Sequence, residues 1–240
     1  MGEAAKKIGE KLEQFGGNYL LTHLGWQEII SDREIKCTRA THKNPEGKSK
    51  KTHGIDLLSK FYNPYSNAGQ AVLIECKNRQ MISITQASVN DWLREIINNI
   101  ECAQSAHELS DIGVDTSILN TGLLLIHAND TFDERKFNSI LKNLSTQNRR
   151  NPINIFIASN REINMWTSLF EEIGRNFPVH DKFDFVYPSI NGSSKMLAKY
   201  IPINALFSKY LFAQYKHDEE STFGTKKVQE EMTGSIIFSF

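Results

Sequence analysis

Three charged residues lie inside two short apolar runs of this 240-residue chain. Asp56 lies in the run 54–57, and Glu75 and Lys77 end the run 71–77. Because alternate side chains of a strand share a face, Glu75 and Lys77 should point the same way. A charge in such a run costs roughly several kcal/mol unless it is paired or binds a metal. The three residues therefore predict a hard-cation site with a lysine beside it, an arrangement suited to metal-dependent phosphodiester cleavage.

The Glu75-x-Lys77 triplet is a weak signal when it is taken alone. The chain is rich in both residue types, so chance supplies such a triplet. A salt bridge at an exposed strand end, which contributes little to stability, is the competing interpretation. The acid in the preceding run and the strand-forming residues before Glu75 favour the metal site.

The surrounding pattern predicts the elements that position these residues. Apolar side chains at steps of three and four residues predict helices, and short apolar runs bounded by turn residues predict strands. In the first half we expect a helix over 3–24, a strand or a strand with a turn over 26–38, strands over 54–60 and 70–77, and a helix over 85–101. In the second half we expect strands over 123–126, 153–158 and 184–187, separated by helices over 131–144 and 161–177. Strands that alternate with helices indicate parallel β–α units.

At these positions the chain resembles the PD-(D/E)xK nuclease superfamily, whose fold is called restriction-endonuclease-like. Gly54-Ile55-Asp56 matches the first acidic motif, with Ile55 in place of the usual proline, and Ile74-Glu75-Cys76-Lys77 matches the second. Many members carry a further glutamate on the helix that opens the core. Here that phrase is Gly9-Glu10-Lys11-Leu12-Glu13-Gln14-Phe15, so Glu13 is the matching acid and Glu10 the alternative. The order of elements is most similar to Mrr-type restriction enzymes and to nuclease effectors of bacterial anti-phage systems.

The resemblance implies an α/β fold, in which a central mixed β-sheet is flanked by helices and extended by further β–α units in the second half. We expect a nuclease core over 1–105 and a β–α extension of the same domain over 106–215. The remaining residues, 216–240, are expected to form a C-terminal tail that is a candidate interaction segment.

The implied metal is Mg²⁺, for which Mn²⁺ can substitute, because Mg²⁺ takes oxygen ligands and needs few of them from the protein. We expect Asp56 and Glu75 as direct ligands and the backbone carbonyl of Cys76 as a third, and Glu13 as a further acid that holds a second ion or a metal-bound water. Lys77 either activates the attacking water or acts as a fixed charge against the phosphate, and the sequence leaves both roles open. The Cys76 side chain is interpreted as a small core residue.

Composition excludes some functions and leaves others open. The chain carries 28 basic and 28 acidic residues, which counts against a general DNA-binding protein but less against a nuclease. No apolar run resembles a signal peptide or spans a bilayer, so we expect a cytoplasmic protein without a membrane partner. The cysteines Cys37, Cys76 and Cys102 are widely spaced, and the histidines show no ligand spacing. Neither a disulfide framework nor a zinc knuckle is indicated.

Several other polar residues have two interpretations. The lysines of the expected loop over 41–52 are either merely solvated or contact a nucleic-acid backbone, and the same holds for Arg149-Arg150. His53, next to the acidic motif, is either a loop-end residue or a phosphate contact. Gln86, at the start of a helix, is either a surface residue or part of the active site.

The predicted function is a Mg²⁺-dependent nuclease that cleaves DNA, acting as the effector subunit of an anti-phage defence complex. An idle nuclease-like module that binds nucleic acid or a partner protein is the rival, and a stand-alone restriction or repair endonuclease is a further alternative. The complete set of Asp56, Glu75 and Lys77 argues against the idle module. Because the sequence shows no recognition domain, we expect a regulatory or sensor protein partner, or a homo-oligomer. The apolar run Ile236–Phe240 is the candidate contact.

Overall fold

The computed structural model describes residues 21–44, 46–65, 67–145, 152–177, 182–188, 195–223 and 226–239. The helix expected over 3–24 therefore lies outside the described residues except for α2 (Leu21–Leu24), and so do Glu10 and Glu13. The described residues form two compact units. The first contains 21–22, 26–61 and 69–163, and the second contains 23–25, 62–68 and 164–239.

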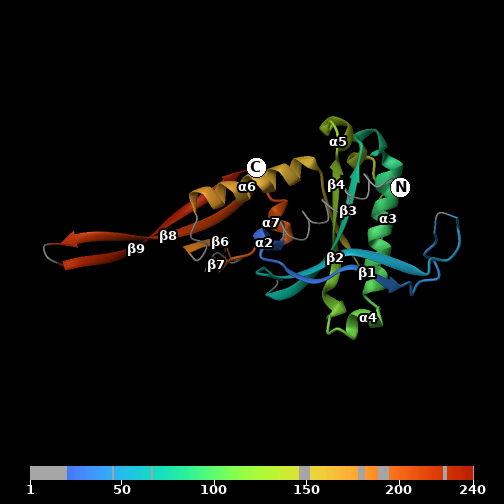
Figure 1. The fold of residues 1–240 in the computed structure, drawn as a ribbon, viewed down its shortest axis with the longest axis horizontal. Helices are drawn as coiled ribbons and strands as arrows, with labels where there is room; N and C mark the ends of the chain where they lie inside the picture. Colours follow the sequence, from blue (N-terminus) through green and yellow to red (C-terminus); the bar gives the residue numbers. More distant parts are fainter. Residues whose placement is uncertain are drawn as a thin grey trace. The chain divides into compact units, whose positions relative to one another are not determined.

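A five-stranded sheet forms the centre of the first unit, in the order β1-β2-β3-β4-β5 (Figure 1). Its strands are β1 (Gln27–Lys36), β2 (Thr52–Asn63), β3 (Ala68–Arg79), β4 (Leu119–Ala128) and β5 (Asn154–Ala158). β1 and β2 are antiparallel, whereas β3, β4 and β5 run parallel to one another. The expected mixed sheet is thus confirmed, and β2 and β3 are neighbours joined by a short connection over 64–67.

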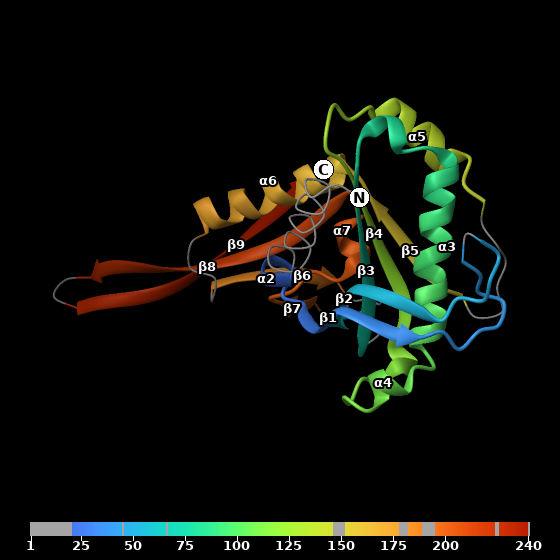
Figure 2. The same ribbon diagram turned by 45° about the vertical axis from the view of Figure 1, so that its right-hand side comes forward.

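Helices pack on this sheet where the sequence periodicity predicts them. The long helix α3 (Gln86–Ala103) begins after Thr85, whose side chain and that of Ser88 form a capping box. It runs beside β3 and β4, and α5 (Glu134–Lys142) lies near the ends to which these strands point (Figure 2). The remaining helical segments of this unit are η2 (Met81–Ser83), α4 (His107–Ser110), η3 (Thr116–Ile118) and the start of α6 (Asn160–Asn176).

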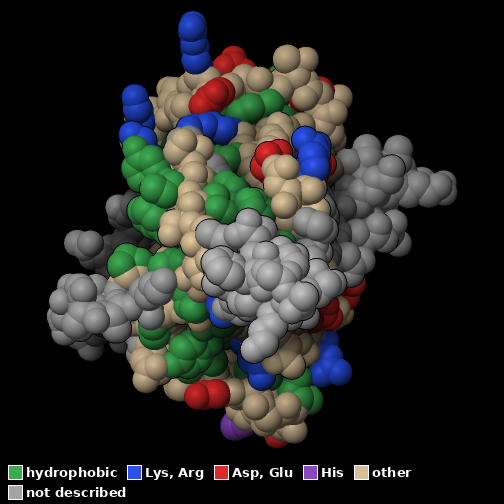
Figure 3. Space-filling view, turned by 90° about the vertical axis from the view of Figure 1, so that its left-hand side faces the viewer, with side chains coloured by type: hydrophobic (Ala, Val, Ile, Leu, Met, Phe, Trp, Pro, Cys, Tyr) green, Lys and Arg blue, Asp and Glu red, His purple; other side chains and the backbone are tan. Residues whose placement is uncertain are grey.

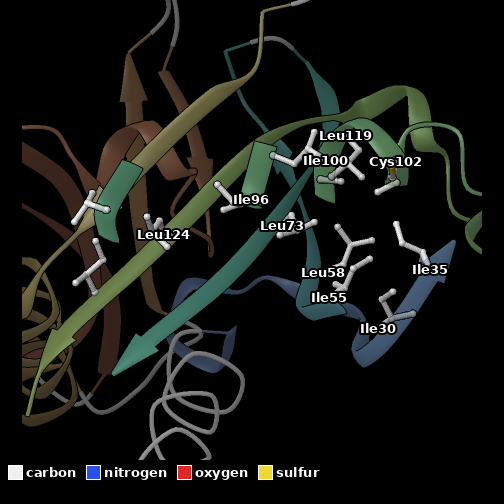
Figure 4. Packing of buried hydrophobic residues seen from close by; sticks show 14 of the residues in the cluster. Ile30, Ile35, Ile55, Leu58, Leu73, Ile96, Ile100, Cys102, Leu119 and Leu124 are labelled. Carbon is white, nitrogen blue, oxygen red and sulfur yellow. The ribbon is translucent and has the colours of Figure 1, made fainter. Parts of the chain in front are cut away.

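The interface between α3 and the sheet is the core of the first unit. Leu73 and Leu124 from the parallel strands and Ile96 and Ile100 from α3 are fully buried there (Figure 4). Each contributes about 1.5–3 kcal/mol by leaving water. Gly122 lets the helix approach the sheet, because a Cβ at that position would lie 2.8–3.0 Å from three isoleucine methyl groups. The core thereby holds α3 against β4 and against β3, the strand that carries Glu75 and Lys77.

The second unit contains an antiparallel sheet in the order β7-β6-β8-β9. Its elements are β6 (Phe183–Pro188), β7 (Lys195–Ala198), α7 (Ile203–Leu206), β8 (Tyr210–Phe223), β9 (Lys226–Ser239) and most of α6. The strand expected over 184–187 is present as β6, but its assignment to a parallel β–α unit is wrong. β6 joins the second sheet instead of continuing the parallel run of β3, β4 and β5, and both of its neighbours, β7 and β8, are antiparallel to it.

The last residues of the chain belong to this antiparallel sheet. β9 pairs along its length with β8, and Ile237 lies opposite Phe212. Both side chains remain exposed, Ile237 to 64% and Phe212 to 43%. Figure 3 shows hydrophobic side chains at the surface, between charged ones, on one face of the molecule. The division of the chain into core, extension and tail stays a prediction.

Candidate active site

The structure brings Asp56, Glu75 and Lys77 together on two neighbouring strands. Asp56 on β2 accepts a hydrogen bond through Oδ2 from the backbone N–H of Cys76 on β3, at 2.9 Å. The Lys77 Nζ atom lies 2.5 Å from Glu75 Oε1. Glu75 and Lys77 therefore share one face of β3, as strand alternation predicts.

The backbone of Cys76 points toward Asp56. In a β-strand the N–H and C=O groups of one residue point to the same neighbouring strand. Since the Cys76 N–H reaches the Asp56 carboxylate, its carbonyl oxygen also points toward β2. A backbone oxygen and two carboxylates are thus available in the same region.

A third carboxylate, which the sequence interpretation missed, comes from α3. Glu95 Oε2 lies 3.3 Å from Lys77 Nζ, and Glu95 Oε1 lies 3.8 Å from Lys50 Nζ. The sequence did contain a signal, because the polar pair Asn98-Asn99 interrupts the apolar residues of the same helix. Asn99 is 1% exposed, and its Nδ2 group donates to the Gly54 carbonyl at 2.9 Å and to Glu75 Oε2 at 3.4 Å.

A fourth acid, Asp32, lies on β1 across from Asp56. Its neighbours Ser31 and Arg33 pair with Leu57 and Ile55, which places Asp32 opposite Asp56 in the register. The Asp32 backbone has a φ of 49°, a conformation that Asp tolerates better than most residues. Its charge contributes to raising the pKa of Asp56.

The electrostatics of the site show an excess of negative charge. Glu75 is 3% exposed, and burial raises its pKa to about 7 although Lys77 opposes the shift. Burial also raises the pKa of Asp56, against the hydrogen bond from Cys76 and the charge of Lys77. For Lys77, burial disfavours the charged form, but Glu75 and Glu95 outweigh it and raise the pKa. Four clustered carboxylates beside two ammonium groups favour a further cation, and oxygen donors suit Mg²⁺ or Mn²⁺.

Other residues considered from the sequence lie elsewhere. Gln86 donates to the Asn143 carbonyl at 2.6 Å, which ties α3 to the end of α5 rather than to the acids. His53 is fully buried in β2, where burial lowers its pKa to about 4, so it is not placed to meet a phosphate from solvent. The loop before β2 approaches the site through the Lys50–Glu95 contact. Arg149-Arg150 lies outside the described residues.

A mixed sheet whose second and third strands carry Asp, Glu and Lys in this arrangement defines a nuclease of the PD-(D/E)xK class. Residues 1–162 match the family model of the GAPS4 protein PD-(D/E)XK nuclease domain, and the chain belongs to this family. Membership implies a phosphodiester hydrolase, and GAPS4 is an anti-phage defence protein. No curated protein matches the chain. Within the described residues, no helix is long and apolar enough to cross a membrane.

Proposed function

We propose that this protein is a Mg²⁺-dependent nuclease that cleaves DNA as the effector of an anti-phage defence complex. The observation that carries the proposal is the meeting of Asp56, Glu75 and Lys77 on two neighbouring strands, where the acids Asp32, Asp56, Glu75 and Glu95 outnumber the two lysines, Lys77 and Lys50. A structural ion pair needs one acid for one base. An excess of acid at a buried site is instead typical of a metal-binding site.

Asp56, Glu75 and the Cys76 carbonyl are the groups that would hold the metal, and Mn²⁺ would substitute for Mg²⁺. A divalent cation lowers the pKa of water and offsets the charge that develops on the phosphate. Glu13 remains the proposed additional acid, with Glu10 as the alternative.

Lys77 contributes a positive charge beside the acids. Glu75 and Glu95 raise its pKa and so keep the ammonium group protonated. This supports a role as a fixed charge that binds and orients the phosphate, rather than as the base that deprotonates water. Glu95 in turn positions the ammonium group from α3.

The lysine-rich loop between β1 and β2 supports a nucleic-acid substrate. Lys50 contacts Glu95, so the loop lies beside the acids. The other lysines of the loop are Lys43, Lys48 and Lys51. Ammonium groups next to a cleavage site attract the phosphate backbone, and the neutral charge of the whole chain leaves such local contacts as the main attraction.

In our proposal, a partner protein regulates the nuclease activity of this chain. A cytoplasmic nuclease that cut DNA freely would damage its own cell. The exposed Phe212–Ile237 pair on β8 and β9 offers an apolar contact for a regulatory or sensor subunit. Replacing both residues by serine should abolish co-purification with the product of a neighbouring gene, and unchanged co-purification would remove this surface from the proposal.

The nuclease proposal is tested with plasmid DNA and a matched RNA, each incubated with Mg²⁺ or with EDTA. The chain is assayed alone and after co-expression with its genomic neighbours, beside the Glu75→Gln variant. We expect Mg²⁺-dependent cleavage of DNA that is stronger in the co-expressed sample and absent from the variant. Equal cleavage in EDTA, or by Glu75→Gln, would contradict the metal site, and preferential cleavage of RNA would overturn the choice of DNA.

A further inference from the structure

A second group of metal-ligating side chains lies in the first unit, apart from the carboxylates. Cys37 follows β1, His42 lies in the loop before β2, His53 lies on β2, and Cys102 lies in the last turn of α3. One ligand atom from each of the four residues falls within 4.8 Å of all the others. His42, His53 and Cys102 are buried and Cys37 is half-buried, so protein covers most of the cluster.

Four of the six distances between the ligand atoms match a tetrahedral metal site, and the two distances from His53 to the sulfur atoms are at most 4.8 Å. Zn–S bonds of about 2.3 Å and Zn–N bonds of about 2.0–2.1 Å imply tetrahedral edges of about 3.8 Å for S–S, 3.5 Å for S–N and 3.3 Å for N–N. Here Cys37 Sγ and Cys102 Sγ are 3.8 Å apart, and His42 Nδ1 lies 3.3 Å from His53 Nε2. His42 Nδ1 lies 3.6 Å from Cys37 Sγ and 3.4 Å from Cys102 Sγ.

The outer ring nitrogens of both histidines bind acceptors. His42 Nε2 lies 2.9 Å from Glu101 Oε2, and His53 Nδ1 lies 2.8 Å from Asn99 Oδ1. The Asn99 amide is oriented by the donation of its Nδ2 group to Gly54 and Glu75, so its oxygen must accept from His53. In neutral imidazoles, His42 Nδ1 and His53 Nε2 therefore both direct lone pairs into the cluster. This outer arrangement is the usual support of histidines that bind a metal.

Backbone and side-chain donors also support the sulfur atoms. The Thr38 N–H donates to Cys102 Sγ at 3.4 Å, and the Thr38 hydroxyl donates to the same sulfur at 3.6 Å. Such donors stabilise a thiolate. Cys37 Sγ donates instead to the Arg39 carbonyl at 3.4 Å, a contact that a metal-bound thiolate would give up.

We propose that Cys37, His42, His53 and Cys102 form a structural zinc site. Two sulfur and two nitrogen donors in tetrahedral geometry favour Zn²⁺ over Mg²⁺ or Ca²⁺, and four protein ligands leave no position for a substrate. The zinc ion would pin both ends of the lysine-rich loop to α3. Through His53 and Asn99 it would also support Glu75, so the ion helps to position the proposed active site without touching substrate.

A disulfide is the competing fate of the two cysteines. Their sulfur atoms are 3.8 Å apart, well beyond the bond length of about 2.05 Å. A disulfide would also leave the two converging histidine nitrogens without a cation. The two fates differ in mass and in metal content, so one sample distinguishes them.

The first experiment measures metal in the unmodified protein. The full chain is expressed with zinc, passed through EDTA to remove weakly bound metal, and analysed by elemental and native mass spectrometry. We expect about one zinc ion per chain, with Cys37 and Cys102 both reduced and not joined by a disulfide. Protein without zinc, or with a Cys37–Cys102 disulfide, would overturn the proposal. The result does not depend on nuclease activity, so it stands apart from the test of the active site.

The second experiment assigns the ligands. Cobalt replaces zinc in the unmodified chain, and the absorption bands of tetrahedral, thiolate-bound cobalt are expected. Cys102→Ser should lose the thiolate-to-cobalt intensity together with most of the bound zinc, whereas Cys76→Ser and His107→Gln should keep their full zinc content. An octahedral cobalt spectrum in the unmodified chain, or loss of zinc in a control equal to that in Cys102→Ser, would contradict the assignment.

Discussion

Two groups of polar side chains in the first unit differ in the metal that each suits. The acidic site around Asp56 and Glu75 offers oxygen donors and carries excess negative charge, and Lys77 and Glu95 border it. The cluster of Cys37, His42, His53 and Cys102 offers four sulfur and nitrogen donors from the protein, and three of the four residues are buried. Hard, partly hydrated cations suit the first arrangement, and a tightly held borderline cation such as Zn²⁺ suits the second.

The difference shows how one fold can hold a metal site for catalysis and a separate metal site for structural stability. A metal that acts on a substrate must keep open positions, so its ligands alone cannot hold the surrounding strands rigid. A closed site can fix a loop and a helix permanently. Asn99 is the residue common to both, because it contacts His53 of one group and Glu75 of the other.

The largest effect is expected from removing a charge at the acidic site. Glu75→Gln and Asp56→Asn should each lower the cleavage rate about 1000-fold, because several kcal/mol of transition-state stabilisation depend on the metal that these groups would hold. Cleavage kinetics under Mg²⁺ measure this decrease. The double variant should be no slower than either single one, since residues that act as a unit are not additive.

Stability provides the control for this prediction. Glu75→Gln should unfold at the same temperature as the unmodified chain or higher, because one of several crowded acids is neutralised. Glu34→Gln, an exposed glutamate on β1, should leave the rate unchanged. A variant at Asp56 or Glu75 that cuts at the unmodified rate removes that residue from the site.

The next largest effect is expected from removing a ligand of the Cys/His cluster, and it should appear as a lower free energy of unfolding. Cys102→Ser should lower the free energy of unfolding by about 3–5 kcal/mol, since zinc binding is coupled to folding. Urea unfolding with and without zinc measures this. The unmodified chain should lose stability when zinc is removed, and the variant should respond little. If zinc removal lowered the stability of both proteins equally, the effect of zinc on folding would not come from this cluster.

The sequence predicts the acidic site far better than the Cys/His cluster, and the reason is chain distance. Asp56, Glu75 and Lys77 lie on consecutive strands, so strand alternation and a short turn already bring them together. The four ligands of the cluster are spread along the chain from Cys37 to Cys102, and only the docking of α3 on the sheet places these two cysteines side by side. Local spacing therefore could not show the cluster, and the statement that no zinc knuckle is indicated holds only for local motifs.

The same limit applies to the fold. The five strands of the first sheet and the helix α3 follow from periodicity, because each buries an apolar face. Periodicity could not show that β6 pairs with antiparallel strands. The sequence pattern of a short buried strand is similar whether its neighbours run parallel or antiparallel to it. Glu95 and Asp32 were missed for a related reason: only the packing of α3 and β1 against the motif strands brings them near it.

A smaller effect is expected at the link between the two groups. Asn99→Ala should lower the cleavage rate about 10- to 100-fold, as the removal of outer-shell partners of metal ligands does. It should also cost about 1–3 kcal/mol of stability, because Gly54 and His53 lose a buried hydrogen-bond partner. Zinc content should be retained. A decrease that falls entirely on the KM term, with kcat unchanged, would show that Asn99 does not position Glu75.

The smallest effect is expected in the lysine-rich loop. Replacing Lys48 and Lys51 by alanine should weaken DNA binding several-fold and reduce the slope of affinity against salt concentration by about one for each phosphate that is no longer neutralised. Binding to a labelled duplex at several salt concentrations measures this in the catalytically inactive Glu75→Gln background. Lys142→Ala, at an exposed position on α5, is the matched control. If the double substitution left this slope unchanged, the lysines of the loop would be solvated and would not contact the DNA backbone.

The most direct test of two distinct metal sites is anomalous diffraction from crystals that were grown with zinc and soaked in Mn²⁺. Data recorded on either side of the zinc absorption edge distinguish the two elements in one crystal. We predict a zinc peak among Cys37, His42, His53 and Cys102, and a manganese peak between the carboxylates of Asp56 and Glu75. Absence of the manganese peak from the acids, or of zinc from the Cys/His cluster, would contradict the account.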